Sequence, residues 1–158
     1  MSVDPDFLVL AARGTAGAVD AKKDLEEAGA VANDQTEADP KKLQDAMARL
    51  RALLKAEAVS GGEEALCHTF IAHCLFRLGR TEEAADEYGT ALRLGAGGPF
   101  HRGWVHFRLG NIADLRGKRK DALEHYNAVI ESKGSSSTAV GRARKCLEKP
   151  YRGYKADG

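Results

Sequence analysis

Apolar residues recur along much of the chain with the spacing of one face of an α-helix. Within residues 41–58, four of them fall at i, i+4, i+7 and i+11, which predicts an amphipathic helix. They are Leu43, Met47, Leu50 and Leu54. Similar spacing, separated by glycine-containing turns, predicts further helices over 63–78, 81–94, 100–115, 118–132 and 137–148. Runs of β-branched residues typical of strands are absent, so the pattern predicts an all-α fold.

Polar and conformationally special residues mark the expected helix ends. Asp39-Pro40 predicts the start of the 41–58 helix, with the aspartate as N-cap and the proline in the first turn. Gly79 predicts the end of the 63–78 helix, and Thr81 is the predicted N-cap of the next. Towards the N-terminus, residues 3–32 form an alanine-rich stretch with weak spacing that we expect to break near Gly14–Gly17.

Two helical pairs are copies of one pattern set 38 positions apart. The paired residues are Gly79 and Gly117, Ala84 and Ala122, Tyr88 and Tyr126, His68 and His106, and Ala72 and Gly110. A small residue at a helix crossing, followed one turn later by a tyrosine that fills the gap, explains the pattern. The same step back from Tyr88 reaches Leu50, so the 41–58 helix is interpreted as the second helix of a degenerate first unit. Residues 15–32 are expected to replace its first helix. A fixed period of this length predicts stacked helical units.

The repeated positions resemble the tetratricopeptide-repeat family. The matching residues are Ile71-Ala72, Leu75, Gly79, Ala84, Tyr88 and Ala91, then Leu109-Gly110, Ala113, Gly117, Ala122, Tyr126 and Val129. The resemblance implies a right-handed stack of helical hairpins with about seven helices. The implied parts are an N-terminal helical extension and linker (1–40), a repeat domain (41–149) and a flexible tail (150–158). The repeat domain divides into a half repeat (41–58), two repeats (63–95 and 100–132) and a closing helix (137–148). The spacing exceeds the usual 34 residues, which we attribute to the Gly95–Pro99 loop.

In this family the first helix of each repeat lines a concave groove that holds peptides of partner proteins. The resemblance therefore implies a partner-binding groove made of Thr69, His73, Phe76, Arg77, Trp104, Phe107, Arg108, Asn111, Asp114, Arg142 and Lys145, with Lys149 beside them. Asn111 is expected to hydrogen-bond a peptide backbone, since an amide both donates and accepts. The basic residues favour an acidic segment or a C-terminal carboxylate. A helical ligand would instead use Trp104 and Phe107 as anchors. The family's full carboxylate-binding pattern is not met, because Thr69 and His73 replace the expected lysine and asparagine. The alternative interpretation is a solvated helix face.

The distribution of charge adds nucleic-acid binding as an alternative function. Residues 1–94 carry 17 acidic and 11 basic residues, whereas residues 95–158 carry 6 acidic and 13 basic residues. The basic third includes the cluster Arg116–Lys120 and two tyrosines in the tail, an arrangement compatible with single-stranded nucleic acid. The overall net charge of only +1 argues against nucleic acid as the partner. A homotypic assembly domain is the other alternative to a protein–protein interaction module.

Composition and the remaining motifs exclude several other classes. The longest apolar run, Phe7–Ala12, is far shorter than the roughly 18–20 residues of a membrane span, so no membrane association is expected. Three cysteines are too few for a disulfide framework and indicate a cytoplasmic protein with reduced thiols. Cys67-His68 and His73-Cys74 do not converge on one helical face, so no metal is expected. No catalytic constellation or cofactor motif is found, which predicts a non-enzymatic function.

Overall fold

The described part of the chain is built from helices alone. A computed structural model describes residues 20–34, 36 and 39–153, and every regular element within them is an α-helix. In chain order these are a helical segment over 20–33, α2 (Pro40–Lys55), α3 (Gly62–Arg77), α4 (Thr81–Arg93), α5 (Pro99–Leu115), α6 (Arg119–Glu131) and α7 (Ser137–Glu148). The all-α prediction and its count of about seven helices are confirmed for these residues. The predicted break near Gly14–Gly17 lies outside them.

Helix starts follow the predicted signals with one exception. Asp39 is the N-cap of α2, and its carboxylate accepts a hydrogen bond from the Lys41 N–H at 2.9 Å. Thr81 was predicted to cap α4, but it is the first helical residue, and the cap position belongs to Arg80. The Arg80 side chain cannot accept a hydrogen bond from the helix and instead pairs with Glu83, at 2.6 Å.

Glycines with positive φ end the first helix of each hairpin. Gly79 has φ +77° and Gly117 has φ +72°, a region that residues with a side chain rarely adopt. At Gly79 the N–H of Arg80 reaches back to the carbonyl of Leu75, which is the Schellman arrangement. The helix predicted over 41–58 ends three residues earlier than expected. Glu57 takes φ +52°, and the helix stops at Lys55.

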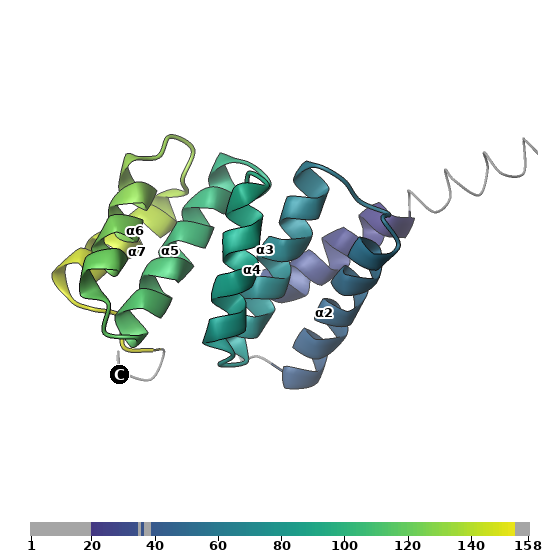
Figure 1. Ribbon diagram of the computed structural model, residues 1–158, viewed down its shortest axis with the longest axis horizontal. Coiled ribbons are helices and arrows are strands. Elements are labelled where there is room, and N and C mark those ends of the chain that lie inside the picture. The colour runs from purple at the N-terminus through teal and green to yellow at the C-terminus, as the bar shows by residue number, and fades with distance from the viewer. Residues whose placement is uncertain (1–19, 35, 37–38, 154–158) are drawn as a thin grey trace, which may run out of the picture.

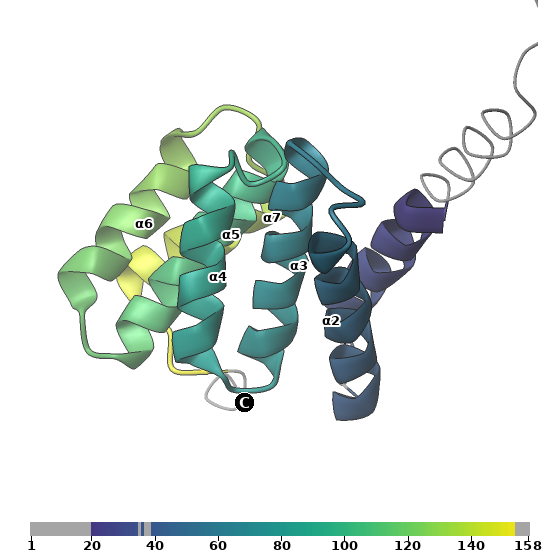
Figure 2. The same ribbon diagram turned by 45° about the vertical axis from the view of Figure 1, so that its right-hand side comes forward.

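The helices stack in chain order along the long axis of the molecule, from the N-terminal segment and α2 to α6 and α7 (Figure 1). The closest pairs are α3 with α4 and α5 with α6, which form two helical hairpins. Between hairpins, α2 packs on α3 and α4 packs on α5, and α7 closes the stack against α6 and α5 (Figure 2). This is the helical-repeat stack that the sequence predicted.

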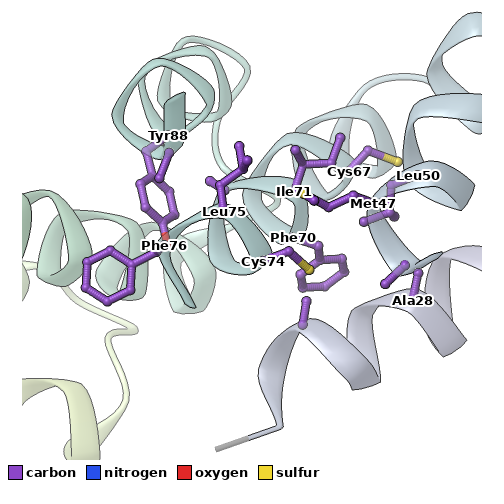
Figure 3. Packing of buried hydrophobic residues seen from close by; sticks show 14 of the residues in the cluster. Ala28, Met47, Leu50, Cys67, Phe70, Ile71, Cys74, Leu75, Phe76 and Tyr88 are labelled. Carbon is purple, nitrogen blue, oxygen red and sulfur yellow. The ribbon is translucent and has the colours of Figure 1, made fainter. Parts of the chain in front are cut away.

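The helical segment 20–33 packs against α2 and α3. Ala21, Leu25, Ala28 and Ala32 belong to the main apolar core, which also contains Leu50 of α2 and Phe70 of α3 (Figure 3). Contact with Phe70 is so close that a methyl group added to Gly29 would lie 2.6 Å from the ring. The described part of the 15–32 segment therefore packs on α2 and α3.

A fully buried tyrosine lies between the two helices of each hairpin. Tyr88 and Tyr126 have no exposed surface, and burial this complete requires a partner for each hydroxyl. The Tyr88 hydroxyl lies 2.6 Å from Nδ1 of His73. The Tyr126 hydroxyl donates to Asp114 at 2.8 Å and accepts from the side-chain amide of Asn111 at 3.1 Å. The first helix of each hairpin thus supplies the partner of the tyrosine on the second.

The beginning of the predicted flexible tail is held against the stack. The Tyr151 N–H donates to the Asp114 carboxylate at 2.8 Å, and the Tyr151 ring lies 6.3 Å from the ring of Phe76. Asp114 also binds Arg119 at 3.0 Å, and Arg119 in turn donates to two carbonyls at the end of α7. One buried carboxylate therefore connects Tyr151 to α5 and, through Arg119, to the end of α7, while flexibility of the tail stays a prediction. The predicted tail residues 154–158 lie outside the described part.

The tight crossing of α5 and α6 predicts that Gly110→Ala is destabilising. The added methyl group would lie 2.5 Å from a ring carbon of Tyr126, whose position is held by two hydrogen bonds from α5. We expect a loss of about 1–3 kcal/mol in the free energy of unfolding, measured by urea denaturation. Gly89→Ala is the matched control, since nothing lies within 4 Å of its added methyl group. The control should gain about 0.5–1 kcal/mol from helix propensity. Equal gains from both substitutions would contradict the crossing as a constraint.

The buried His73 predicts a loss of stability in acid. Burial, with Arg108 nearby, lowers the pKa of His73 from its ordinary 6.5 to about 3. The unfolded chain therefore binds a proton below pH 6.5 that the folded chain does not, and this contribution to stability is present above pH 6.5 and is lost as the pH falls. We expect the free energy of unfolding to decline by up to about 1.4 kcal/mol per pH unit from this group between pH 6.5 and 4.

His73→Gln should flatten that decline, because glutamine does not titrate but still hydrogen-bonds Tyr88. Tyr88→Phe is the control, since it removes the hydrogen bond and leaves the titrating imidazole in place. Denaturation midpoints of the three proteins across this pH range would test the assignment. A slope unchanged by His73→Gln would show that other groups carry the acid sensitivity.

Candidate functional site

The structure buries half of the residues that the sequence assigned to an open groove. Six of them have less than a tenth of their surface exposed: Thr69, His73, Phe76, Phe107, Arg108 and Asn111. Another four are partly exposed: Arg77, Trp104, Asp114 and Arg142, although the side chain of Asp114 is itself only 1% exposed. Lys145 and Lys149 are exposed on or just beyond α7. The predicted groove residues therefore differ widely in how accessible they are to a partner protein.

Asn111, expected to hold a peptide backbone, is fully occupied inside the hairpin. It has no exposed surface, and its amide donates to the Tyr126 hydroxyl and accepts from Arg108 at 3.3 Å. Thr69 is equally buried, and its hydroxyl donates to the Ala65 carbonyl of its own helix at 3.0 Å. In this arrangement both side chains stabilise the fold.

Arg77 and Asp114 connect the repeat hairpins to the segments that precede and follow them. The guanidinium of Arg77 donates to the carbonyl oxygens of Val31 and Thr36, each at 2.9 Å, and so holds the end of helix 20–33. Asp114 accepts from Arg119 and Tyr151, as described above. Both residues lie on first helices, but their polar atoms are directed to the protein itself.

Arg108 is a buried cation among aromatic rings. Its guanidinium carbon lies 4.7 Å from the centroid of the Phe76 ring and 5.5 Å from that of Phe107, which are cation–π distances. Trp104 lies one turn earlier on α5, with its ring edge-on to Phe107 at 5.8 Å. The guanidinium of Arg142 lies 5.6 Å from the Trp104 centroid. These contacts form a continuous row of arginine and aromatic groups across α3, α5 and α7.

This row borders a pocket of about 380 Å³, which we call the concave pocket. Its walls come from helix 20–33, the first helices α3 and α5, and α7 with the loop before it. The lining residues are Ala32, Asn33, His73, Arg77, Phe100, His101, Trp104, Arg108, Ser136, Thr138 and Arg142. Five of the predicted groove residues meet here: His73, Arg77, Trp104, Arg108 and Arg142.

Sequence reasoning missed the remaining pocket residues, and the most important of them is Phe100. The residue is 51% exposed, which is unusual for a large aromatic residue, and its ring packs edge-on to His101. Phe100 follows the glycine-rich loop at the very start of α5, and the position 38 residues earlier is Gly62, so the repeat pattern gave no signal there. Ala32 and Asn33 were missed because the docking of helix 20–33 is a tertiary feature.

The concave pocket is electropositive. Three arginines line it, and no aspartate or glutamate does. Burial lowers the pKa of both His73 and His101, so neither histidine adds charge at neutral pH. By contrast, a second pocket of about 270 Å³ between α2, α3 and α4 includes Glu83, Asp86 and Glu87 among its lining residues. The two pockets therefore favour ligands of opposite charge.

The cysteines and histidines of α3 do not form a metal site. His68 lies 2.6 Å from the Glu87 carboxylate and His73 contacts Tyr88, while burial raises the pKa of Cys67 and Cys74 to about 11. Across the described residues, no group of three or more His, Cys, Asp or Glu side chains is arranged to hold a metal ion.

The basic cluster at 116–120 is partly neutralised within the stack. Arg116 pairs with Glu82 of the preceding hairpin, and Arg119 is held by Asp114 and the end of α7. Among the described helices, none is long and apolar enough to cross a membrane.

Comparison with known proteins agrees with the geometry. Residues 63–133, which contain both hairpins from α3 to α6, match the tetratricopeptide repeat family. No curated protein and no solved structure matches the chain. Repeats of this family generally mediate protein–protein interaction and are typically non-catalytic. Residues 63–133 of this chain are therefore tetratricopeptide repeats.

Proposed function

We propose that this protein recruits a partner protein by binding an acidic, partly apolar segment of it in the concave pocket. The observation that carries the proposal is the composition of the lining: three arginines, no carboxylate, and aromatic side chains at the rim. A charged and aromatic pocket of this kind supplies both specificity and contact area for a peptide.

Aromatic and basic residues have different roles in this proposal. Phe100 and Trp104 contact apolar side chains of the ligand, and Phe100 has the exposed area to do so. Arg142 and Arg108 attract its carboxylates, since guanidinium groups bind carboxylates with charge-assisted hydrogen bonds. Arg142 is the more accessible of the two, because Arg108 is only 5% exposed.

The buried groove residues act indirectly. Asn111 and Phe107 hold Arg108 and Tyr126 in place, so they shape the pocket without contacting the ligand. Recognition therefore relies on charge and aromatic contact more than on reading the ligand backbone, which is where the proposal departs from the resemblance-based expectation for Asn111.

Charge reversal at the pocket predicts loss of partner binding. Arg142→Glu replaces an attractive guanidinium by a repulsive carboxylate and should weaken binding of an acidic segment by about 10–100-fold. The measurement is affinity capture from native lysate with the full chain as bait, followed by titration of the recovered partner. Arg144→Glu is the matched control, because it makes the same charge change two residues away, at an exposed position outside the pocket lining.

Partners retained by wild type and Arg144→Glu but lost by Arg142→Glu would support the concave pocket as the binding site. Equal capture by all three baits would move the interaction to another surface. Nuclease treatment of the lysate separates the nucleic-acid alternative, since material that disappears with nuclease is held through nucleic acid and not through a peptide.

A further inference from the structure

We propose that residues 4–10 of this same chain occupy the concave pocket and act as an internal competitor of the partner. The inference rests on the proposed function, because it requires that the pocket accept an acidic, apolar segment. It adds the identity of one such segment and a regulatory consequence for binding.

The sequence of this segment matches the chemistry of the pocket. Asp4-Pro5-Asp6 places two carboxylates one residue apart, and Phe7-Leu8-Val9-Leu10 begins the apolar run that extends to Ala12. Carboxylates complement the three pocket arginines, and an aromatic residue complements the exposed ring of Phe100. Residues 1–19 lie outside the described part of the structure.

The connection between segment and pocket is long enough. Helix 20–33 ends at the pocket, where Ala32 and Asn33 form part of the wall. From residue 20 to residue 32 the helix axis spans about 18 Å, at roughly 1.5 Å per residue. Residues 11–19 span up to about 30 Å when extended, so the chain can return along the helix to the pocket. Gly14 and Gly17 within this stretch allow the reversal of direction.

Covalent attachment makes weak affinity sufficient. A short linker gives an effective concentration of about 1 mM, so an intrinsic dissociation constant near 0.1 mM would fill the pocket in about nine of ten molecules. An external ligand then meets a free pocket in only about one molecule of ten, and its apparent affinity falls about tenfold. A partner must therefore bind more tightly than the chain's own segment, or engage a second surface, to be retained.

A competition experiment on the full chain tests the inference. The probe is a fluorescently labelled synthetic peptide that copies residues 2–12, and its binding is followed by fluorescence anisotropy. The emission of Trp104, the single tryptophan of the chain, gives a second readout inside the pocket. The D4N/D6N/F7A variant should bind the probe about tenfold more tightly than wild type, because its own segment no longer competes. The control variant D45N/E131Q makes the same net charge change at two exposed positions outside the pocket lining and should behave as wild type.

Each other outcome overturns the inference in a different way. Equal probe affinity for wild type and the triple variant would show that the segment does not occupy the pocket, although the pocket itself still binds acidic peptides. No probe binding to any form would show that this segment is not a ligand, and the Arg142→Glu capture experiment would then decide the proposed function separately. If the control variant also bound the probe more tightly than wild type, the change in affinity would come from net charge and not from the loss of the competing segment. Concentration-dependent self-association of wild type that is lost in the triple variant would place the segment in the pocket of a second copy.

Discussion

A tyrosine buried between the two helices of each hairpin needs a hydrogen-bond partner for its hydroxyl, and much of this structure depends on how that partner is supplied. The rings of Tyr88 and Tyr126 fill the crossings, but each brings a hydroxyl that must be hydrogen-bonded away from water. The first helix answers with a polar residue at the equivalent position of each repeat, His73 in one and Asn111 in the other. Polar side chains that a family comparison would assign to a binding surface are thereby directed into the hairpins.

Contacts made by polar side chains of the first helices also cover much of the concave face. Arg77 holds the end of helix 20–33, and Asp114 binds Tyr151 and, through Arg119, the end of α7, so helix 20–33 and the segment after α7 are fastened to the first helices. Two clear repeats are fewer than the three usually needed for a stable stack, and these additions supply the missing burial. What stays open is the pocket between them, lined by arginines and aromatic rings. Its charge and shape follow from how the ends are capped.

The candidate site was only partly predictable. Trp104 and Arg108 on α5 and Arg142 on the closing helix α7 were found because their positions follow from the repeat register, and all three line the pocket. Exposure was not predictable in the same way. The periodicity of a sequence shows which side chains lie on the same face of a helix. It does not show whether a separate helix, such as 20–33, or the segment after α7 covers that face. Phe100 was missed for a related reason, since it stands outside the repeat pattern at the start of α5.

The sequence by itself determined the helical class, the repeat period and most helix ends. These depend on local features, namely apolar spacing, an aspartate cap at residue 39 and glycines with positive φ at residues 79 and 117. Only the tertiary structure decided which concave residues face solvent, because that depends on contacts between segments far apart in the chain. Asn111 shows the difference. Its place on the first helix could be read from the sequence, but its direction is set by a tyrosine fifteen residues later, whose buried hydroxyl it shares with Asp114.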